Sequence, residues 1–227
     1  MDFAWPIATI LYSEKLLTAP LARKMVRRSR RSGVPTIRLT PEQFRSISRA
    51  ERASGVAAIV KQRWCKLPQA LPQDGLCWIA LETVRSPGNL GTLIRSSDAV
   101  GGAGFIFLGK TIDPFDVNVM RATMGSVLHQ KFVRTNLSKL QQWVNRHGCH
   151  VVAASPDGEA DLHQFTYSAP TLLLLGEERK GLTPQQRELC QDLVNIPMVG
   201  TTDSLNLAVA GSLLLYEVYR SQKLSCS

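Results

Sequence analysis

Short runs that are apolar at every position alternate with segments that begin like helices over most of this 227-residue chain. A strand of this kind has both faces buried, as in a parallel sheet that helices cover on both sides. The predicted strands occupy residues 76–81, 105–108, 151–154 and 172–175, with a weaker one at 130–133. We therefore expect an α/β fold built on a parallel sheet with helices on both faces.

Helix starts separate these strands. Thr183, followed by Pro184 and then Gln186, is typical of an N-terminal cap with a capping box. The other helices are expected after caps at Asn89, at Ser138 and at Asp203 or Ser204, and in the region 116–127.

Positive charge is concentrated in the first third of the chain. Residues 1–66 contain 14 Lys and Arg against four Asp and Glu, and the remaining 161 residues contain 13 against 14. Such an asymmetry is typical of an element that binds nucleic acid, because neutralised phosphates release counterions. The alternatives are a solvated basic surface and binding to an acidic membrane. The predicted RNA-binding residues are Arg23, Arg27, Arg28, Arg30, Arg31 and Arg52.

The basic segment has helix and strand signals of its own. Residues 22–32 are expected to form a helix that ends at Gly33, and Thr40 with Pro41 begins a second helix. Short apolar strands are expected at 34–39 and 56–60. The expected division of the chain is a small basic α/β domain over 1–66, a linker without pattern over 67–75 and a larger domain over 76–227.

Several other classes of protein are disfavoured. Residues 104–111 fit the spacing of a phosphate-binding loop, but the four central residues are bulky and apolar. His147, Cys149 and His150 have no second cluster to complete a metal site, so no metal is expected. Five scattered cysteines without a CxxC pair, and the lack of a signal peptide or a membrane span, indicate a reduced cytoplasmic protein.

Three polar stretches follow predicted strands, which is where parallel α/β proteins bind ligands. Residues 82–102 hold Asn89 and, six residues later, Arg95. Residues 172–182 leave a strand at Gly176, and residues 193–220 pass through a polar loop into an apolar helix. Each could be a plain turn, but their coincidence in one domain indicates a ligand site.

Together the three stretches resemble the motifs of the SpoU-type, TrmH-like RNA ribose 2'-O-methyltransferases of the SPOUT class. The matching residues are Asn89, Gly91 and Arg95; Gly176, Glu178 and Gly181; and Ile196, Pro197 and Met198 followed by Ser204, Leu205 and Asn206. Two residues depart from the pattern: Arg179 stands where many relatives have glycine, and Ala208 stands where a serine often follows. Residues 1–66 resemble more loosely a small ribosomal-protein-like RNA-binding domain with its beginning missing.

The resemblance implies S-adenosylmethionine as the methyl donor, no metal, a C-terminal trefoil knot and a homodimer. It assigns the cofactor to the second and third stretches, with Gly176, Ile196, Met198, Gly200 and Leu205 as binding residues. It assigns activation of the 2'-hydroxyl to Arg95, with Asn89, Glu178, Ser204 and Asn206 positioning the ribose and the loops.

Arg95 has two expected roles. A guanidinium group has a pKa above about 12 and is a poor base, so it either acts as base with help from the substrate phosphate or clamps that phosphate and stabilises the developing alkoxide. The family acts on ribosomal RNA and on transfer RNA, and the N-terminal domain favours ribosomal RNA by analogy. A base methyltransferase of the same class and a catalytically silent RNA-binding protein remain as alternatives.

Overall fold

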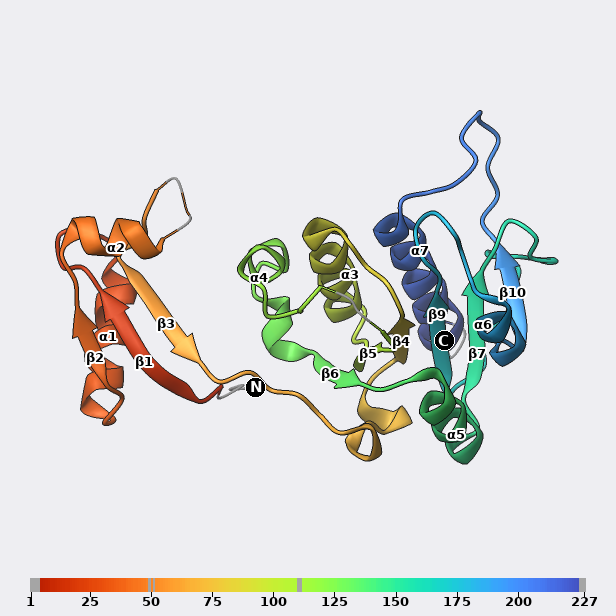
Figure 1. The fold of residues 1–227 in the computed structure, drawn as a ribbon, viewed down its shortest axis with the longest axis horizontal. Helices are drawn as coiled ribbons and strands as arrows, with labels where there is room; N and C mark the ends of the chain where they lie inside the picture. Colours follow the sequence, from red (N-terminus) through yellow and green to blue (C-terminus); the bar gives the residue numbers. More distant parts are fainter. Residues whose placement is uncertain (1–4, 49, 51, 110–111, 225–227) are drawn as a thin grey trace. The chain divides into compact units, whose positions relative to one another are not determined.

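The structure is a computed structural model that describes residues 5–48, 50, 52–109 and 112–224 (Figure 1). The chain divides into two compact units, Met1–Gln62 and Arg63–Ser227, which we call the N-terminal unit and the large unit.

The N-terminal unit is a three-stranded sheet with two helices. Strand β1 is central, parallel to β2 and antiparallel to β3. Its elements are β1 (Ile7–Tyr12), α1 (Pro20–Arg31), β2 (Thr36–Arg38), α2 (Pro41–Ile47) and β3 (Val56–Val60). Ile10, Tyr12, Leu17 and Val26 form its buried core.

Both helix signals of this unit are confirmed. The Thr40 side chain accepts a hydrogen bond from the backbone N–H of Gln43, and the Gln43 side chain accepts one from the N–H of Thr40. Gly33 follows the end of α1 with a φ of 82°, a left-handed conformation that favours glycine.

The large unit contains a seven-stranded sheet in the order β6-β5-β4-β9-β7-β10-β8, and all its pairings are parallel. The strands are β4 (Cys77–Leu81), β5 (Gly104–Phe107), β6 (Lys131–Arg134), β7 (His150–Ala154), β8 (Ala160–Asp161), β9 (Thr171–Leu175) and β10 (Asp192–Asn195). Every residue of β4, β5 and β9 is buried, as the unbroken apolar runs predicted. Gly104 and the three residues after it belong to β5, which agrees with rejecting a phosphate-binding loop there.

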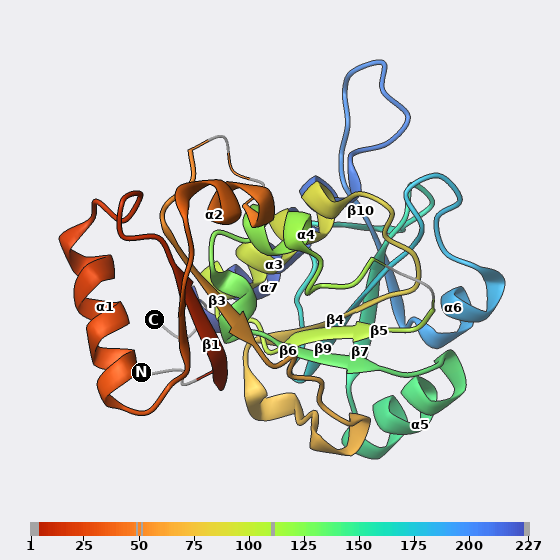
Figure 2. The ribbon, with the colours of Figure 1, turned by 60° about the vertical axis from the view of Figure 1, so that its left-hand side comes forward.

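Helices cover both faces of this sheet (Figure 2). Helices α3, α4 and α7 pack together on one face, and α5 and α6 cover the other, which confirms the expected α/β fold. The helices and single turns are α3 (Pro87–Ala99), α4 (Val117–Ala122), α5 (Leu137–His147), α6 (Pro184–Leu189), α7 (Leu207–Tyr219), the 3-10 turns η1 (Leu67–Gln69), η2 (Pro72–Asp74) and η3 (Ser126–His129), and the π turn η4 (Arg220–Leu224).

The capping box at Thr183 is also confirmed. The cap of α5 was predicted wrongly. Asn136, and not Ser138, accepts the hydrogen bond from the backbone N–H of Lys139, so the cap lies two residues earlier than expected and α5 begins at Leu137. An asparagine carbonyl reaches the third N–H of a helix as readily as a serine hydroxyl does, so both candidates fit the sequence.

Residues 67–75 are not the unpatterned linker that the sequence predicted. They contain η1 and η2, and Ala70 between them is fully buried. The carbonyls of Ala70 and Leu71 accept hydrogen bonds from the indole N–H groups of Trp143 at 2.9 Å and Trp78 at 2.8 Å. A buried indole N–H needs an acceptor, and this stretch supplies two. It is therefore part of the large unit.

Within the described residues, each helix is too short or too polar to cross a lipid bilayer.

Candidate functional site

Strand register brings the first and second stretches together at one edge of the sheet. Leu81 of β4 lies opposite Leu175 of β9, so Glu82 and Gly176 leave the sheet side by side. Because all strands are parallel, the loops after β7 and β10 leave from the same edge. Segments that lie far apart in the sequence therefore meet there.

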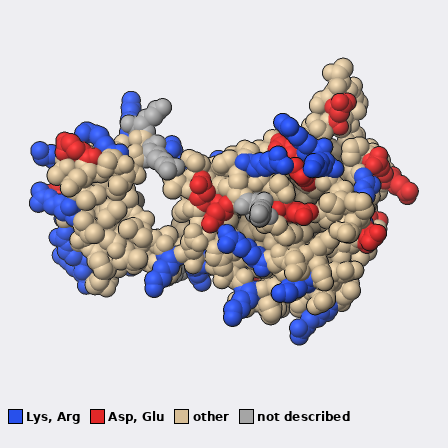
Figure 3. Space-filling view, in the orientation of Figure 1, with Lys and Arg blue, Asp and Glu red and all other residues tan. Residues whose placement is uncertain are grey.

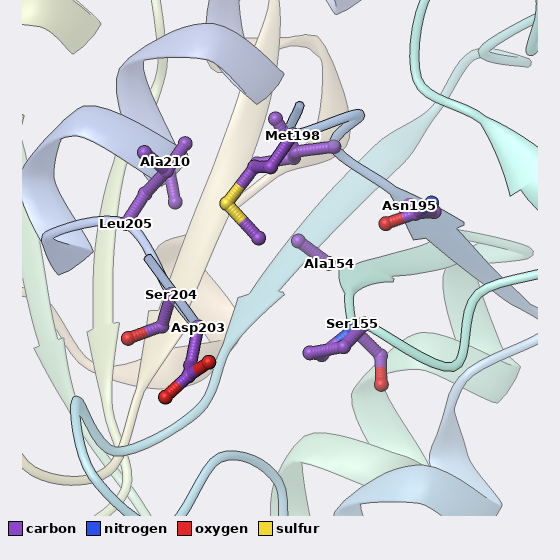
Figure 4. A pocket seen from close by; sticks show the side chains of 10 residues that line it. Ala154, Ser155, Asn195, Met198, Asp203, Ser204, Leu205 and Ala210 are labelled. Carbon is purple, nitrogen blue, oxygen red and sulfur yellow. The ribbon is translucent and has the colours of Figure 1, made fainter. Parts of the chain in front are cut away.

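The loops after β7 and β10 enclose a pocket (Figure 4). The backbone N–H of Ser155 donates to the carbonyl of Val194, which fixes the two strand ends against each other. The pocket is lined by Ala154, Ser155, Pro156, Asn195, Ile196, Met198, Asp203, Ser204, Leu205 and Ala210. Figure 4 shows the Met198 side chain extending toward the space between Leu205 and Ala154.

The predicted cofactor residues fall into two groups. Ile196, Met198 and Leu205 line the pocket, together with Ser204, whereas Gly176 and Gly200 are not among its lining residues. The sequence prediction missed Ser155, Pro156 and Asn195. Ser155 and Pro156 directly follow the strand predicted at 151–154, whereas Asn195 is the last residue of β10 and lies inside the short apolar run that precedes Pro197.

Gly176 has a structural reason to be glycine. A Cβ atom there would lie 2.4 Å from the carbonyl carbon of Gly181. Glu177 and Gly181 exchange two backbone hydrogen bonds of 2.9 and 2.8 Å, and Gly181 has a φ of 64°. Both glycines are thus needed for a tight turn that projects Glu178.

Gly200 lies in the segment between β10 and α7, which projects away from the sheet in Figure 1. The side chain of Val199 beside it is fully exposed. A Cβ atom at Gly200 would meet nothing within 4 Å. The cofactor role predicted for Gly176 and Gly200 stays a prediction.

Three side chains from the three stretches form a hydrogen-bonded hub. Asn89 Nδ2 donates to Glu178 Oε1 at 3.1 Å, and Asn206 Nδ2 donates to Asn89 Oδ1 at 3.0 Å and to Glu178 Oε1 at 3.3 Å. Asn89 and Asn206 belong to α3 and to the start of α7, and Glu178 lies on the turn between them. The sequence grouped these residues by resemblance, and the structure brings them into contact.

Two cap predictions at the hub were wrong. Ser86, not Asn89, caps α3 by accepting a hydrogen bond from the N–H of Asn89. Asn206 caps α7 in place of Asp203 or Ser204, because its Oδ1 accepts from the N–H groups of the two residues that follow Leu207. The correction matters for function. It leaves the Asn89 amide free for the hub and gives Asn206 both a capping and a linking role.

Arg95 lies on α3 outside the hub. Six residues of helix separate it from Asn89 by about 9 Å along the axis and about 120° around it. Its side chain is exposed and has no hydrogen bond or ion pair with any other described residue. A guanidinium in this situation is available to an incoming anion.

A second hollow lies beside Glu178. It is lined by Thr83, Arg85, Ser86, Glu177, Glu178 and Arg179. Arg85 and Glu177 form an ion pair of 2.9 Å across it. Figure 3 shows Lys and Arg side chains gathered near acidic ones on the visible face of the large unit.

Three cysteines of the large unit, Cys77, Cys149 and Cys190, are unsuited to nucleophilic chemistry. Burial raises the pKa of Cys77 to about 12 and that of Cys149 to about 11. It also raises the pKa of Cys190 to about 11, against a smaller opposite effect of Arg187. These thiols are protonated at neutral pH. Among the described residues, no group of three or more His, Cys, Asp or Glu is arranged to hold a metal ion.

The predicted RNA-binding arginines also differ in their surroundings. Arg23 Nε donates to the carbonyl of Leu17 at 2.7 Å, and Arg30 donates to the Tyr12 hydroxyl at 2.5 Å. Arg27, Arg28, Arg31 and Arg52 have exposed side chains that make no such contact with another described residue.

Comparison with known proteins identifies the family. Residues 77–216 match the SpoU rRNA methylase family. The 23S rRNA (uridine(2479)-2'-O)-methyltransferase of Streptomyces viridochromogenes is 31% identical over 98% of this chain and 79% of its own length. The matches to three further curated relatives cover 64 to 66% of this chain and 46 to 61% of the relatives' own length.

Solved structures agree with this result. The crystal structure of an AdoMet-bound rRNA methyltransferase from Sinorhizobium meliloti has a TM-score of 0.87 at 35% identity, over 97% of this chain and 82% of that one. The SpoU methyltransferase AviRb from Streptomyces viridochromogenes in complex with AdoMet has a TM-score of 0.85 at 31% identity, over 99% and 86%. The chain therefore belongs to the SpoU rRNA methylase family, as its three motifs predicted.

Proposed function

We propose that this protein transfers a methyl group from S-adenosylmethionine to a ribose 2'-hydroxyl of ribosomal RNA. The observation that carries the proposal is that one unit holds the pocket and the hub of Asn89, Glu178 and Asn206 at the same edge of its sheet. Arg95, which has no partner among the described residues, lies on the helix that carries Asn89. Two similar structures contain the cofactor, and one similar protein is named for 2'-O-methylation of 23S rRNA, which supports both the donor and the acceptor.

The pocket suits the cofactor in its chemistry. Ile196, Met198 and Leu205 offer apolar surface to a flat adenine ring, and the polar side chains of Ser155, Asn195 and Ser204 in the lining offer donors and acceptors. The projecting segment that carries Gly200 would close over the ligand. When bound, the cofactor supplies an electrophilic methyl group on a sulfonium ion.

Arg95 is the proposed group at the target hydroxyl. The new bond forms as the methyl group leaves sulfur, and the hydroxyl proton must be accepted or its developing negative charge stabilised. The exposed guanidinium would bind the adjacent phosphate and stabilise the alkoxide, or act as base with help from that phosphate. Ser204, at the pocket wall, would help to orient the ribose.

The hub is proposed to hold the reaction geometry. One amide on α3, one at the start of α7 and one carboxylate on the turn after β9 fix the three loops to one another. Each link joins residues at least 28 positions apart in the chain. Loss of any of them would move the pocket wall relative to α3.

Three wider features belong to the same proposal. The chain goes from β9 out to β10 and returns to pack α7 against α3 and β9, which supports a trefoil knot in this region. Val209, Leu213 and Tyr216 form an exposed apolar stripe along α7, which supports a homodimer through this helix. The basic N-terminal unit would hold the RNA, which the enzyme would meet in the cytoplasm.

Titration of the purified protein with S-adenosylmethionine, followed by methyl transfer to unmethylated ribosomal RNA, tests the proposal. We expect stoichiometric binding and a 2'-O-methylated nucleoside in the digested product. Binding without transfer to ribose, but with a methylated base, would support a base methyltransferase. Absence of cofactor binding would support a silent RNA-binding protein.

The dimer is tested separately by sedimentation. Leu213→Glu is expected to give a monomer, whereas Glu217→Gln on the same helix is expected to leave the dimer intact. A wild-type monomer would contradict this part.

A further inference from the structure

Helix α1 carries six Lys and Arg residues, of which two make contacts inside the N-terminal unit and four form an exposed stripe. Arg23 and Arg30 are engaged inside the N-terminal unit. Arg30 contacts the Tyr12 hydroxyl, Thr36 Oγ1 at 3.1 Å and the face of the Tyr12 ring. These contacts brace α1 against β1 and β2, so both guanidinium groups have a structural task.

The other four cations form a stripe. Lys24, Arg27, Arg28 and Arg31 have the spacing of one helix face, at i, i+3, i+4 and i+7. All four are exposed, and none has a hydrogen bond or ion pair with another described residue. Glu14, which lines a hollow beside Arg27, is paired with Arg38 at 2.8 Å. Among the described residues of this unit, no carboxylate pairs with the stripe.

Two large apolar side chains adjoin this stripe. Leu21 is 69% exposed and Met25 is 58% exposed. At 100° per residue, Lys24 and Arg28 lie between this apolar pair and the other two cations. The opposite side of the helix, at Val26, packs into the small core. Figure 2 shows α1 to one side of the small sheet, so its outer face is directed away from β1, β2 and β3.

We propose that this outer face of α1, at Leu21, Lys24, Met25, Arg27, Arg28 and Arg31, binds RNA at a place where a base is unpaired. The stripe spans about 10 Å, which corresponds to about three phosphates along one strand. A uniform duplex offers phosphates but keeps its bases stacked inside. Unpaired bases present faces to apolar side chains and guanidinium planes. This inference rests on the proposed function, since it names how that enzyme holds its RNA.

The test measures binding of the full-length protein to two fluorescent RNA hairpins of equal length over a range of salt concentrations. One hairpin is continuously paired and the other contains an unpaired internal loop. The first variant combines Lys24→Gln, Arg27→Gln, Arg28→Gln and Arg31→Gln. Its control removes the same number of charges elsewhere in the unit, through Lys15→Gln, Arg38→Gln, Arg45→Gln and Lys61→Gln. The second variant combines Leu21→Ser and Met25→Ser.

The stripe variant should weaken binding of the looped hairpin at least about tenfold. It should reduce the slope of log affinity against log salt by about 2 to 2.7, because each of the about three lost phosphate contacts removes about 0.7 to 0.9. The charge-control variant should change the affinity for the looped hairpin and the salt slope much less. The apolar variant should keep the slope and lose the preference for the looped hairpin.

Three results would overturn the inference: equal losses in the stripe variant and its control, equal binding of both hairpins by the wild type, or no effect of the apolar variant. Tighter binding to phosphatidylglycerol vesicles than to either RNA would also overturn it and assign the face to a membrane surface. Cofactor titration and methyl transfer with the wild type are read in parallel. A wild type that methylates RNA but whose binding ignores α1 refutes only this inference, and one that binds RNA through α1 without methylating it refutes only the proposed function.

Discussion

The hub at the sheet edge and the outer face of α1 differ in how their polar side chains are satisfied. At the hub, Asn89, Glu178 and Asn206 satisfy one another within 3.3 Å, so their positions are fixed before any ligand arrives. On α1, four cations are exposed and have no hydrogen bond or ion pair in the part of the chain that the structure describes. A reaction centre needs side chains that are positioned before the substrate binds, whereas a surface that binds a charged polymer needs charge that is not neutralised within the protein. The effect of a substitution at the hub should depend on which atoms it changes, whereas the effect of a substitution on the outer face of α1 should depend on how much charge it removes.

The largest effect is expected from Arg95→Ala. Removing the group proposed to stabilise the developing alkoxide should lower kcat by about 100-fold or more, with little change in cofactor affinity. Single-turnover methyl transfer and calorimetric titration measure the two quantities. Arg95→Lys sharpens the result because it keeps the charge. Near-normal turnover in that variant would contradict a special role for the planar guanidinium.

Asn206→Asp should give the next largest effect. The new carboxylate keeps the acceptor that caps α7 but removes the donor and adds a negative charge about 3 Å from Glu178. Turnover should fall about tenfold or more and recover partly as the pH is lowered, since the repulsion raises the pKa of both carboxyl groups. Asn206→Ala, which loses the cap without adding charge, is the control. Activity of the Asp variant equal to that of the parent would show that the hub does not hold the site.

Gly91→Ala should act on stability and not on charge or chemistry. A Cβ atom there would lie 2.3 Å from the Cβ of Ala122, where α3 and α4 approach closely. Overpacking of this kind costs about 1–3 kcal/mol of unfolding free energy. Gly88→Ala on the same helix is the matched control, because its Cβ would meet only Ser86 Oγ at 3.6 Å. Chemical denaturation should separate the two, and equal midpoints would contradict the packing reason.

The smallest expected effect is a difference in unfolding free energy between substitutions of two arginines of α1. Arg30→Gln should lower the unfolding free energy by about 1 kcal/mol, because its contacts with Tyr12 and Thr36 are lost. Arg27→Gln should change it by less than about 0.5 kcal/mol and weaken RNA binding instead. The reverse pattern would show that the two guanidinium groups have been assigned the wrong tasks.

Much of the fold could be predicted from the sequence because its signals are local. The apolar runs at 77–81 and 171–175 are buried parallel strands, and the capping boxes at Thr40 and Thr183 start helices where expected. The linker failed for a nonlocal reason. Its carbonyls accept hydrogen bonds from tryptophans in other elements, which no pattern within residues 67–75 reveals.

The candidate site shows the same limit. The motifs assigned Asn89, Glu178 and Asn206 to one predicted site, but the hydrogen bonds among them depend on strand order and register. Asn89 was expected to cap α3, and Ser86, three residues earlier, is an equally good capping residue. Only the path of the backbone decides between them. Ser155 and Asn195 were missed because they belong to no recognised motif and enter the pocket only through the topology of the sheet.

The most direct test is ribose-methylation mapping of ribosomal RNA from cells with and without the gene, repeated after treatment of the unmethylated RNA with purified protein and S-adenosylmethionine. We predict one 2'-O-methyl site that is absent without the gene and restored by the protein, but not by its Arg95→Ala variant. An unchanged ribose map together with a lost base methylation, or no change at all, would contradict the proposed reaction.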